Sequence, residues 1–198
     1  AQPGASGWSA EWSVGDSLWD ANKPHRAAFV RNAALVAAAG EYVAFLDDDD
    51  VWLPSKLAVQ IPRMRVAGSS FSASEALCGP LQRLRPWWPH RFEQGLEDQR
   101  FRLYHRDLHR KELCRRAPSF DPDVPCGIRE DLLLRHNLLI TSTVVISAEL
   151  LAEMGPMSLD APWEDYEYWI RAVSVAHEVL HVPEPLAVYD AEHGAATR

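Results

Sequence analysis

The sequence of 198 residues contains only three cysteines, and their positions predict no cysteine-based site. Cys78, Cys114 and Cys126 lie far apart without CxxC spacing, which argues against a zinc site and against a disulfide framework. An odd number of cysteines cannot pair completely within one chain, and this favours a reducing compartment. We therefore expect a cytoplasmic protein, or one that lies at the periphery of a membrane.

Long hydrophobic runs are missing as well. The longest uninterrupted apolar run, residues 33–39, is far shorter than the roughly 20 residues that a transmembrane helix needs. The opening AQPGASGW has neither the basic start nor the apolar stretch of a signal peptide. The start also has no glycine-rich phosphate loop, and a metal-dependent nucleotidyltransferase would need one.

Basic residues are too few for a protein that mainly binds nucleic acid or an anionic membrane. The formal charge is −8 and the isoelectric point is about 5.4. The charge is unevenly distributed, because residues 68–135 hold 12 of the 20 Lys and Arg residues but 10 of the 28 Asp and Glu residues. The rest of the chain is strongly acidic, which suits the binding of a cation.

The composition and length are those of one globular domain. Hydrophobic residues make up 47% of the chain and charged residues 24%, and a chain of this length forms one compact core with one active site. The predicted order of helix, strand, acidic loop and helix is typical of α/β proteins. We predict a single α/β domain in which helices flank a mostly parallel central sheet.

The first half of the chain predicts two helices and a strand. Residues 1–24 contain no apolar run of strand length and are predicted to be irregular. The alanine-rich segment 26–39 predicts a helix that ends at Gly40. The continuous apolar run YVAFL, residues 42–46, predicts a central parallel strand, and Pro54 is well placed in the first turn of a second helix.

The last third of the chain is again well patterned. The sequence ITSTVVI, residues 140–146, predicts a strand, and SAELLAEMG predicts a helix capped by Ser147 and ended by Gly155. The remaining predicted elements are a helix over residues 162–176 and short strands at residues 179–182 and 186–189.

The middle of the chain, residues 68–135, has no clear period. Residues 96–116 favour a polar surface helix. On such a helix His105 and His109 lie four residues apart with Cys114 nearby, but exposed histidines are favoured over a zinc site.

Four consecutive carboxylates, Asp47 to Asp50, follow the predicted strand directly. The carboxyl end of a strand is where open α/β sheets bind ligands. Because the four charges repel one another, a hard cation such as Mg²⁺ or Mn²⁺ is their natural partner. A solvated acidic turn is the alternative, whereas an EF-hand is excluded because Trp52 and Ala58 stand where glycine and glutamate are required.

A second acidic pair, Glu164-Asp165, begins the helix predicted over residues 162–176. Asp165 shares one helical face with Trp169, Ala172 and Ala176, so we expect it to point toward the interior or a cleft. That position makes Asp165 a candidate general base. The alternative is that both carboxylates only complement the helix dipole.

Three segments in this order resemble the family 2 glycosyltransferases of the GT-A fold. They are RNAALVAAAGEYVAFLDDDDVWLPSKL, ITSTVVISAELLAEMG and WEDYEYWIR. The resemblance spans roughly residues 22–193, although residues 68–135 match only as the variable region that such enzymes use for acceptors. It implies an inverting glycosyltransferase that uses a nucleoside-diphosphate sugar, a hydroxyl acceptor and a divalent metal ion.

The resemblance assigns the donor and metal residues. Asp47-Asp48-Asp49 is similar to the DxD motif, in which Asp47 and Asp48 lie near the nucleotide ribose and Asp49 binds the metal ion, with Asp47 as a second candidate ligand. Arg31 and Asn32 match an Arg-Asn pair beside the donor.

The resemblance also assigns the acceptor side. It makes Asp165 the base that deprotonates the acceptor hydroxyl, with Glu164 beside it, and it places Trp163 and Thr143 at the acceptor. Family members often end in YRxH, whose histidine binds the metal. The corresponding His193 is one residue late and the arginine is absent.

The predicted domain, residues 1–198, therefore has four parts. They are an irregular start (1–24), a donor and metal half (25–67), a variable acceptor region (68–135) and a half that carries the base (136–198). The usual opening strand and nucleotide-binding segment of the family are not recognisable, so we expect a domain that is truncated at its N-terminus. A non-catalytic remnant of such a domain is the alternative function.

Overall fold

A seven-stranded sheet organises the part of the chain that the computed structural model describes, which is residues 26–87, 94–95, 101–105 and 124–191. The helical elements are α1 (Arg26–Ala37), α2 (Lys56–Ala67), η2 (Leu81–Trp87), α5 (Glu130–Leu133), η4 (Thr141–Thr143), α6 (Ala148–Met154) and α7 (Glu164–Ala176). The strands are β1 (Tyr42–Ala44), β2 (Val51–Trp52), β3 (Phe71–Gly79), β4 (Arg102–Leu103), β5 (Cys126–Arg129), β6 (Val144–Ser147) and β7 (Glu178–Asp190).

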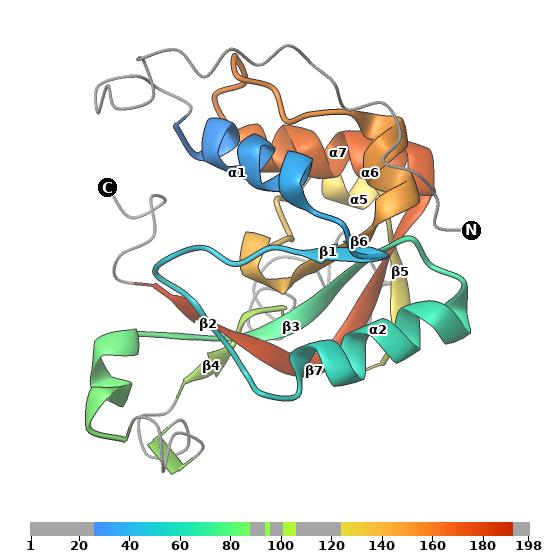
Figure 1. Cartoon of the computed structure of the whole chain (residues 1–198). Coiled ribbons are helices and arrows are strands. Elements are labelled where there is room, and N and C mark those ends of the chain that lie inside the picture. The colour runs from blue at the N-terminus through green and yellow to red at the C-terminus, as the bar shows by residue number, and fades with distance from the viewer. Residues whose placement is uncertain (1–25, 88–93, 96–100, 106–123, 192–198) are drawn as a thin grey trace.

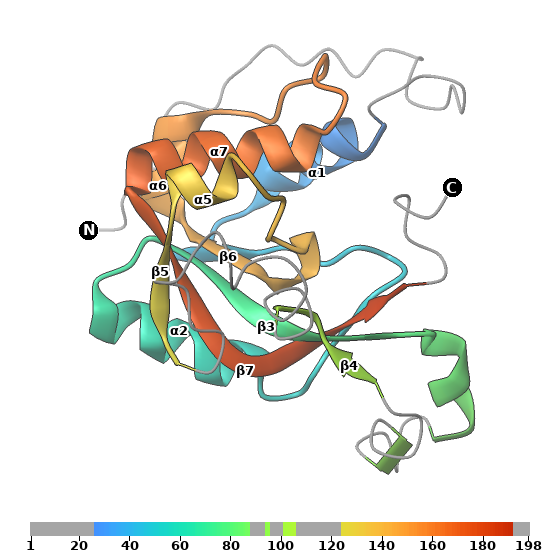
Figure 2. The same ribbon diagram turned by 180° about the vertical axis from the view of Figure 1, so that it is seen from behind.

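The sheet is curled, and helices cover both of its faces. α1, α5, α6 and α7 lie on one face and α2 lies on the other (Figure 1). The view from behind shows the same layers, with β3 and β7 running through the middle of the molecule (Figure 2). The strand order is β1-β6-β3-β7-β2, with β4 beside β3 and β5 beside β7. The predicted α/β fold with flanking helices is therefore confirmed.

The predicted strand directions are wrong. Within the described residues, β3 pairs with β7 in parallel, and every other strand pair is antiparallel. β1 pairs only with β6 and lies at the edge of the described sheet, although a central parallel strand was predicted there. The apolar run was misleading, because only one of its five residues, Phe45, is buried, and Phe45 lies just after the strand. Leu46 is exposed.

The segment predicted as a strand over residues 140–146 begins instead with the tight turn η4, and β6 starts only at Val144. The two short strands predicted near the end form one strand, β7, which continues through Pro183 and Pro185. Its ladder with β3 shifts register around Glu75. A shift of this kind accommodates prolines, which have no N–H to donate to a ladder.

The predicted ends of α6 are confirmed. The hydroxyl of Ser147 accepts a hydrogen bond from the N–H of Leu150 and so caps α6, and Gly155 follows the last turn with a φ of 76°. The ends of α6 were predictable because caps depend on the local conformational freedom of single residues. By contrast, α1 ends at Ala37, before Gly40, and α2 begins at Lys56, so Pro54 lies outside its first turn.

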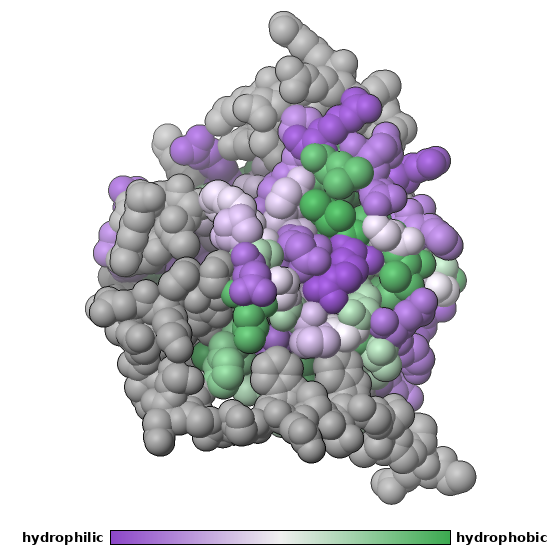
Figure 3. All heavy atoms as spheres, turned by 90° about the horizontal axis from the view of Figure 1, so that it is seen from above, coloured by the Kyte–Doolittle hydropathy of each residue, from purple (hydrophilic) through white to green (hydrophobic). Residues whose placement is uncertain are grey.

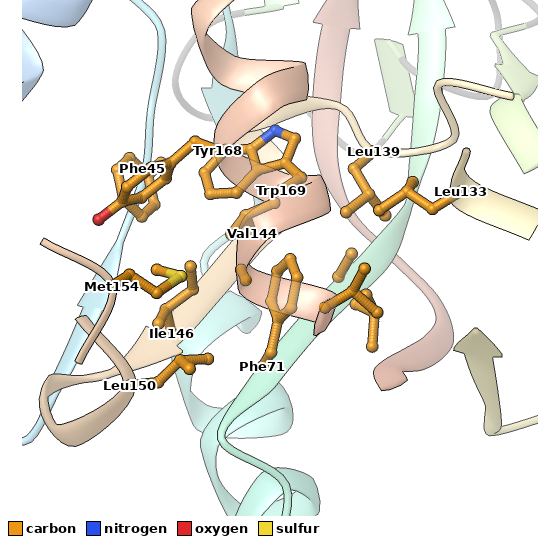
Figure 4. Close-up of a cluster of buried hydrophobic side chains, with 14 of the residues drawn as sticks. Phe45, Phe71, Leu133, Leu139, Val144, Ile146, Leu150, Met154, Tyr168 and Trp169 are labelled. Atoms are coloured by element: carbon orange, nitrogen blue, oxygen red, sulfur yellow. The ribbon is translucent and has the colours of Figure 1, made fainter. Parts of the chain in front are cut away.

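The main core lies between the sheet and the helices α6 and α7 (Figure 4). Trp169 is fully buried at its centre. Its ring contacts Phe45 edge-on, with 5.1 Å between ring centroids, and lies 6.0 Å from the ring of Phe71. Because Trp169 faces inward, the preceding turn of α7 is held in place over the loop that follows β1.

The polar surface helix predicted over residues 96–116 is contradicted at Arg102–Leu103 and in its surface position, although Tyr104 and His105 are helical. Arg102–Leu103 forms β4, which pairs with β3. His105 is fully buried rather than exposed, and its ring lies between the carboxylate of Glu75 (Nδ1 to Oε1, 3.1 Å) and the carbonyl oxygen of Leu138 (2.7 Å from Nε2). The surface position was wrongly predicted because histidine is a polar residue, and the sequence does not show that its polar partners allow it to be buried. His109 and Cys114 lie outside the described residues.

None of the helices in the described part of the chain combines the length and the apolar character needed to cross a bilayer.

Candidate functional site

The acidic loop lies between β1 and β2 and is held against the turn η4. The N–H of Asp47 donates to the hydroxyl of Ser142 at 3.0 Å, and the N–H of Asp50 closes a turn onto the carbonyl of Asp47 at 3.2 Å. The indole N–H of Trp52 donates to the carbonyl of Ser142 at 2.9 Å. The loop that carries the four carboxylates is therefore anchored at both ends.

Arg31 joins the two acidic motifs. One of its terminal nitrogens lies 2.6 Å from Oδ1 of Asp47, and the other lies 3.0 Å from Oε1 of Glu164. Burial would lower the pKa of Arg31, but the negative charges of Asp47, Asp165 and Glu164 and the hydrogen bond that Arg31 donates to Asp47 outweigh it and raise that pKa. Arg31 and Glu164, which are 133 positions apart in the sequence, thus meet in one half-buried cluster.

Asn32 follows Arg31 in α1, but its side chain bonds to Met157 and not to this cluster. It is buried, and its amide accepts a hydrogen bond from the N–H of Met157 at 2.8 Å and donates one to the carbonyl of the same residue at 2.9 Å. These two bonds fix the loop between α6 and α7 to α1. A direct contact between Asn32 and the donor remains a prediction.

Asp49 has the electrostatic surroundings of a cation ligand. Partial burial, together with the charges of Asp47, Asp48 and Asp190, raises the pKa of Asp49, although a backbone hydrogen bond opposes the shift. A divalent cation would relieve this repulsion. Asp48 is exposed, and His193 lies outside the described residues.

Within residues 26–87, 94–95, 101–105 and 124–191, no group of three or more His, Cys, Asp or Glu side chains could hold a metal ion by itself. Mg²⁺ is usually bound by one or two carboxylates together with substrate phosphates and water. The oxygen atoms of Asp49 and its acidic neighbours fit such a partly protein-bound ion.

Asp50 connects the acidic loop to the end of β7. Its Oδ1 accepts a hydrogen bond from the N–H of Asp190 at 2.9 Å. Its Oδ2 is buried without a hydrogen-bond partner among the described residues. Burial raises the pKa of Asp50 to about 6, against the lowering effects of Ser142 and of the Asp190 N–H.

The raised pKa of Asp50 makes stability depend on pH. The fold favours the protonated acid, so the stability from this group is present at about pH 4 and is lost as pH rises through about 6. In EDTA at pH 7.5, the free energy of unfolding of Asp50→Asn should be about 2–3 kcal/mol higher than that of the unsubstituted protein. At pH 4 the two free energies of unfolding should be nearly equal. Denaturant titrations at several pH values measure this difference. A difference that stays constant from pH 4 to 8 would contradict the assignment.

Asp165 lies in the first turn of α7 with its carboxylate oriented by two hydrogen bonds. Oδ2 accepts from the hydroxyl of Thr141 at 3.0 Å, and Oδ1 accepts from the N–H of Tyr166 at 2.7 Å. Each carboxylate oxygen can accept about two hydrogen bonds, so both retain capacity for the proton of an incoming hydroxyl. This is geometry that a general base can use.

The two residues predicted at the acceptor have different surroundings. Trp163 is 62% exposed, and with Pro162, Tyr166 and Ile170 it lines an open, mostly apolar pocket of about 380 Å³. Thr143 is fully buried, and its hydroxyl donates to the carbonyl of Ile140 at 2.7 Å, so in this arrangement it closes the turn η4. In the view from above, hydrophilic residues gather near the middle of the described surface beside small hydrophobic patches (Figure 3).

Several residues that support the site were not assigned a role from the sequence, although the resemblance places the run Thr141–Thr143 beside the acceptor site. Thr141, Ser142 and Asp190 contact the predicted residues directly. Lys56 is buried beneath the acidic loop, where its ammonium donates to the carbonyl of Thr143 at 3.0 Å, and burial lowers the pKa of Lys56 to about 7. The hydroxyl run TST was a visible signal, but a strand would also have explained it.

Comparison with known proteins agrees with the family resemblance read from the sequence. The model of the family described as Glycosyl transferase family 2 matches residues 22–129. Two Escherichia coli relatives are named as UDP-Glc:α-D-GlcNAc-diphosphoundecaprenol β-1,3-glucosyltransferases. They are WfgD, 49% identical over 45 residues, and WfaP, 48% identical over 48 residues. These matches cover 23% and 24% of this chain and only 18% and 19% of the relatives.

The fold is also similar to a solved structure, that of residues 1–349 of TarS from S. aureus. The TM-score is 0.50 at 16% sequence identity, and the match covers 84% of this chain and 40% of the other. At this identity the likeness concerns the fold, and it supports the GT-A-like architecture predicted from the sequence.

Proposed function

This chain belongs to glycosyl transferase family 2, and on that premise we propose that it moves a sugar from a nucleoside-diphosphate sugar to a hydroxyl acceptor with inversion at the anomeric carbon. One observation carries the proposal. Arg31 brings the loop of Asp47 together with Glu164, the neighbour of Asp165, so that a cation-binding motif and a candidate base share one site.

The donor end of the proposed site is the acidic loop. Asp49, with Asp47 and His193 as further candidates, would hold Mg²⁺ or Mn²⁺, and Asp47 and Asp48 would face the ribose. When bound, the metal ion would supply charge to stabilise the departing diphosphate. Arg31 can exchange its bond with Asp47 for a phosphate oxygen, because a guanidinium binds both kinds of oxyanion.

The acceptor end is the start of α7. Asp165 removes the proton from the acceptor hydroxyl, whose oxygen then bonds to the anomeric carbon from the face opposite the leaving group. The bond from that carbon to the diphosphate oxygen breaks, and its electron pair leaves with the nucleoside diphosphate. The exposed Trp163, two residues before the base, would contact the acceptor.

The relatives suggest the substrates to try first. WfgD and WfaP are named for UDP-glucose and for an acceptor in which GlcNAc is joined to a lipid diphosphate. We propose UDP-glucose and a GlcNAc-diphosphate lipid as the first donor and acceptor.

Calorimetric titration of the purified chain with UDP, GDP and dTDP, each with Mn²⁺ and with EDTA, tests the donor site before any acceptor is needed. We expect one nucleoside diphosphate, UDP first, to bind only when the metal ion is present. No binding of any of the three at millimolar concentration would contradict the proposal and favour a non-catalytic remnant of the domain.

A further inference from the structure

The turn η4, Thr141–Thr143, contacts both motifs of the site. Through Thr141 it contacts Asp165, and through Ser142 it contacts the backbone of Asp47. The two hydroxyls are neighbours in sequence, and each holds one of the two acidic segments.

The turn itself is rigidly supported. All three of its residues are buried, and the N–H and hydroxyl of Thr143 both donate to the carbonyl of Ile140. From below, Lys56 and Gln60 each donate to the carbonyl of Thr143, at 3.0 Å and 2.9 Å. A buried turn with its polar groups satisfied has few alternative arrangements, so it can hold a partner in a defined position.

The segment that leads into the turn is anchored as well. The ring of His105 binds the carbonyl of Leu138, two residues before Ile140, and the backbone N–H of His105 donates to Glu75 of β3 at 2.9 Å. The turn is thus tied to the central strand on one side and to α2 on the other.

The carboxylate of Asp165 needs such an anchor. The torsion that turns a carboxylate about its last bond is broad. The N–H of Tyr166 holds Oδ1 from within α7, and the hydroxyl of Thr141 holds Oδ2 from outside the helix, so the bond from Thr141 relates the carboxylate to the rest of the site. The hydrogen bond from Thr141 fixes Oδ2, and the turn that bears Thr141 also fixes the loop of the donor carboxylates. Base and donor loop are thereby positioned by one element.

We propose that Thr141 is a positioning residue for sugar transfer, whose hydroxyl orients the carboxylate of Asp165 relative to the donor loop held by the same turn. The inference rests on the proposed function. It predicts that loss of the Thr141 hydroxyl impairs the chemical step but leaves nucleotide binding intact, because Thr141 contacts the base and Ser142 contacts the donor loop.

The test compares Thr141→Val, which keeps the branched shape without the hydroxyl, with Thr141→Ser, which keeps the hydroxyl. Transfer from UDP-glucose to a GlcNAc-diphosphate lipid is measured with the full chain, together with the Kd for UDP and Mn²⁺. We expect Thr141→Val to lower kcat about 10- to 100-fold, since small misplacements of a catalytic group have effects of this size. KM and Kd for the donor should change less than about 3-fold, and Thr141→Ser should restore most of kcat.

Thermal unfolding of Thr141→Val, Asp165→Asn and the double variant adds a readout that does not depend on activity. We expect the two shifts in Tm to be non-additive, because the two side chains share one hydrogen bond.

The outcomes separate the two proposals. If the unsubstituted chain transfers sugar and Thr141→Val does so at the same kcat, the positioning role is wrong and the proposed function stands. A Thr141→Val protein that loses UDP binding would also overturn the inference, because the residue would then support the whole fold. If the unsubstituted chain neither binds UDP nor transfers sugar, the proposed function fails, and the role given to Thr141 fails with it.

Discussion

Replacing Asp165 with asparagine should lower kcat for sugar transfer about 1,000-fold, because the amide cannot take the proton of the acceptor hydroxyl. The asparagine amide can keep both contacts, because its oxygen can accept from the N–H of Tyr166 while its NH₂ group donates to the hydroxyl oxygen of Thr141, so the structure of the turn should be kept. The affinity for the nucleoside diphosphate and the metal ion should remain within about 3-fold, since Asp165 acts on the acceptor side. Transfer assays at saturating donor, with calorimetry on the same preparation, measure both quantities.

The matched control is Asp131→Asn. Asp131 also lies in the first turn of a helix, α5, so its replacement removes the same charge from the same kind of position, but the residue is exposed and pairs only distantly with Arg129, at 3.9 Å. We expect its kcat to be unchanged. Equal losses in the two variants would mean that the effect comes from helix stability, and an unchanged rate in Asp165→Asn would show that another group is the base.

Asp49→Asn should weaken metal-dependent binding of the nucleoside diphosphate by about 100-fold or more. An amide is a weaker ligand for a hard cation than a carboxylate, and the ion holds the diphosphate. Because partial burial and the neighbouring carboxylates raise the pKa of Asp49, removing its charge should not destabilise the metal-free protein. Calorimetry with Mn²⁺ and denaturant unfolding in EDTA test the two halves of this expectation.

Asp160→Asn serves as the control for this change, since Asp160 is an exposed carboxylate that is not part of the acidic loop. It should bind nucleotide with unchanged affinity. If Asp49→Asn binds nucleotide and Mn²⁺ as tightly as the control does, the metal ion is held elsewhere. Binding that is equally strong in EDTA for both proteins would contradict the metal requirement altogether.

Several features of the fold were predictable because they depend on neighbouring residues in the chain. The end of α6 at Gly155 and its cap at Ser147 follow from local backbone and side-chain preferences. The inward face of Asp165 follows from the helical period that buries Trp169. The family resemblance, read from three ordered motifs, is confirmed over residues 22–129.

Other features were not predictable because they depend on partners distant in sequence. The edge position and antiparallel pairing of β1 are set by β6, a strand about 100 residues away, and nothing in the run YVAFL specifies that partner. The burial of His105 depends on Glu75 and Leu138, which only the folded chain brings within hydrogen-bond distance. The polarity of a residue can be read from the sequence, whereas its contact with a distant residue depends on how the chain folds.

The sequence by itself determined the chemistry available to this protein: an acidic loop suited to a divalent cation, a carboxylate on the inner face of a helix and one α/β domain to carry both. Only the tertiary structure decided how these groups cooperate. Arg31 bridges Asp47 and Glu164, and the turn η4 holds the donor loop and Asp165 at once. Hydrogen bonds and ion pairs act over a few ångströms, so their partners are settled by folding and not by order along the chain.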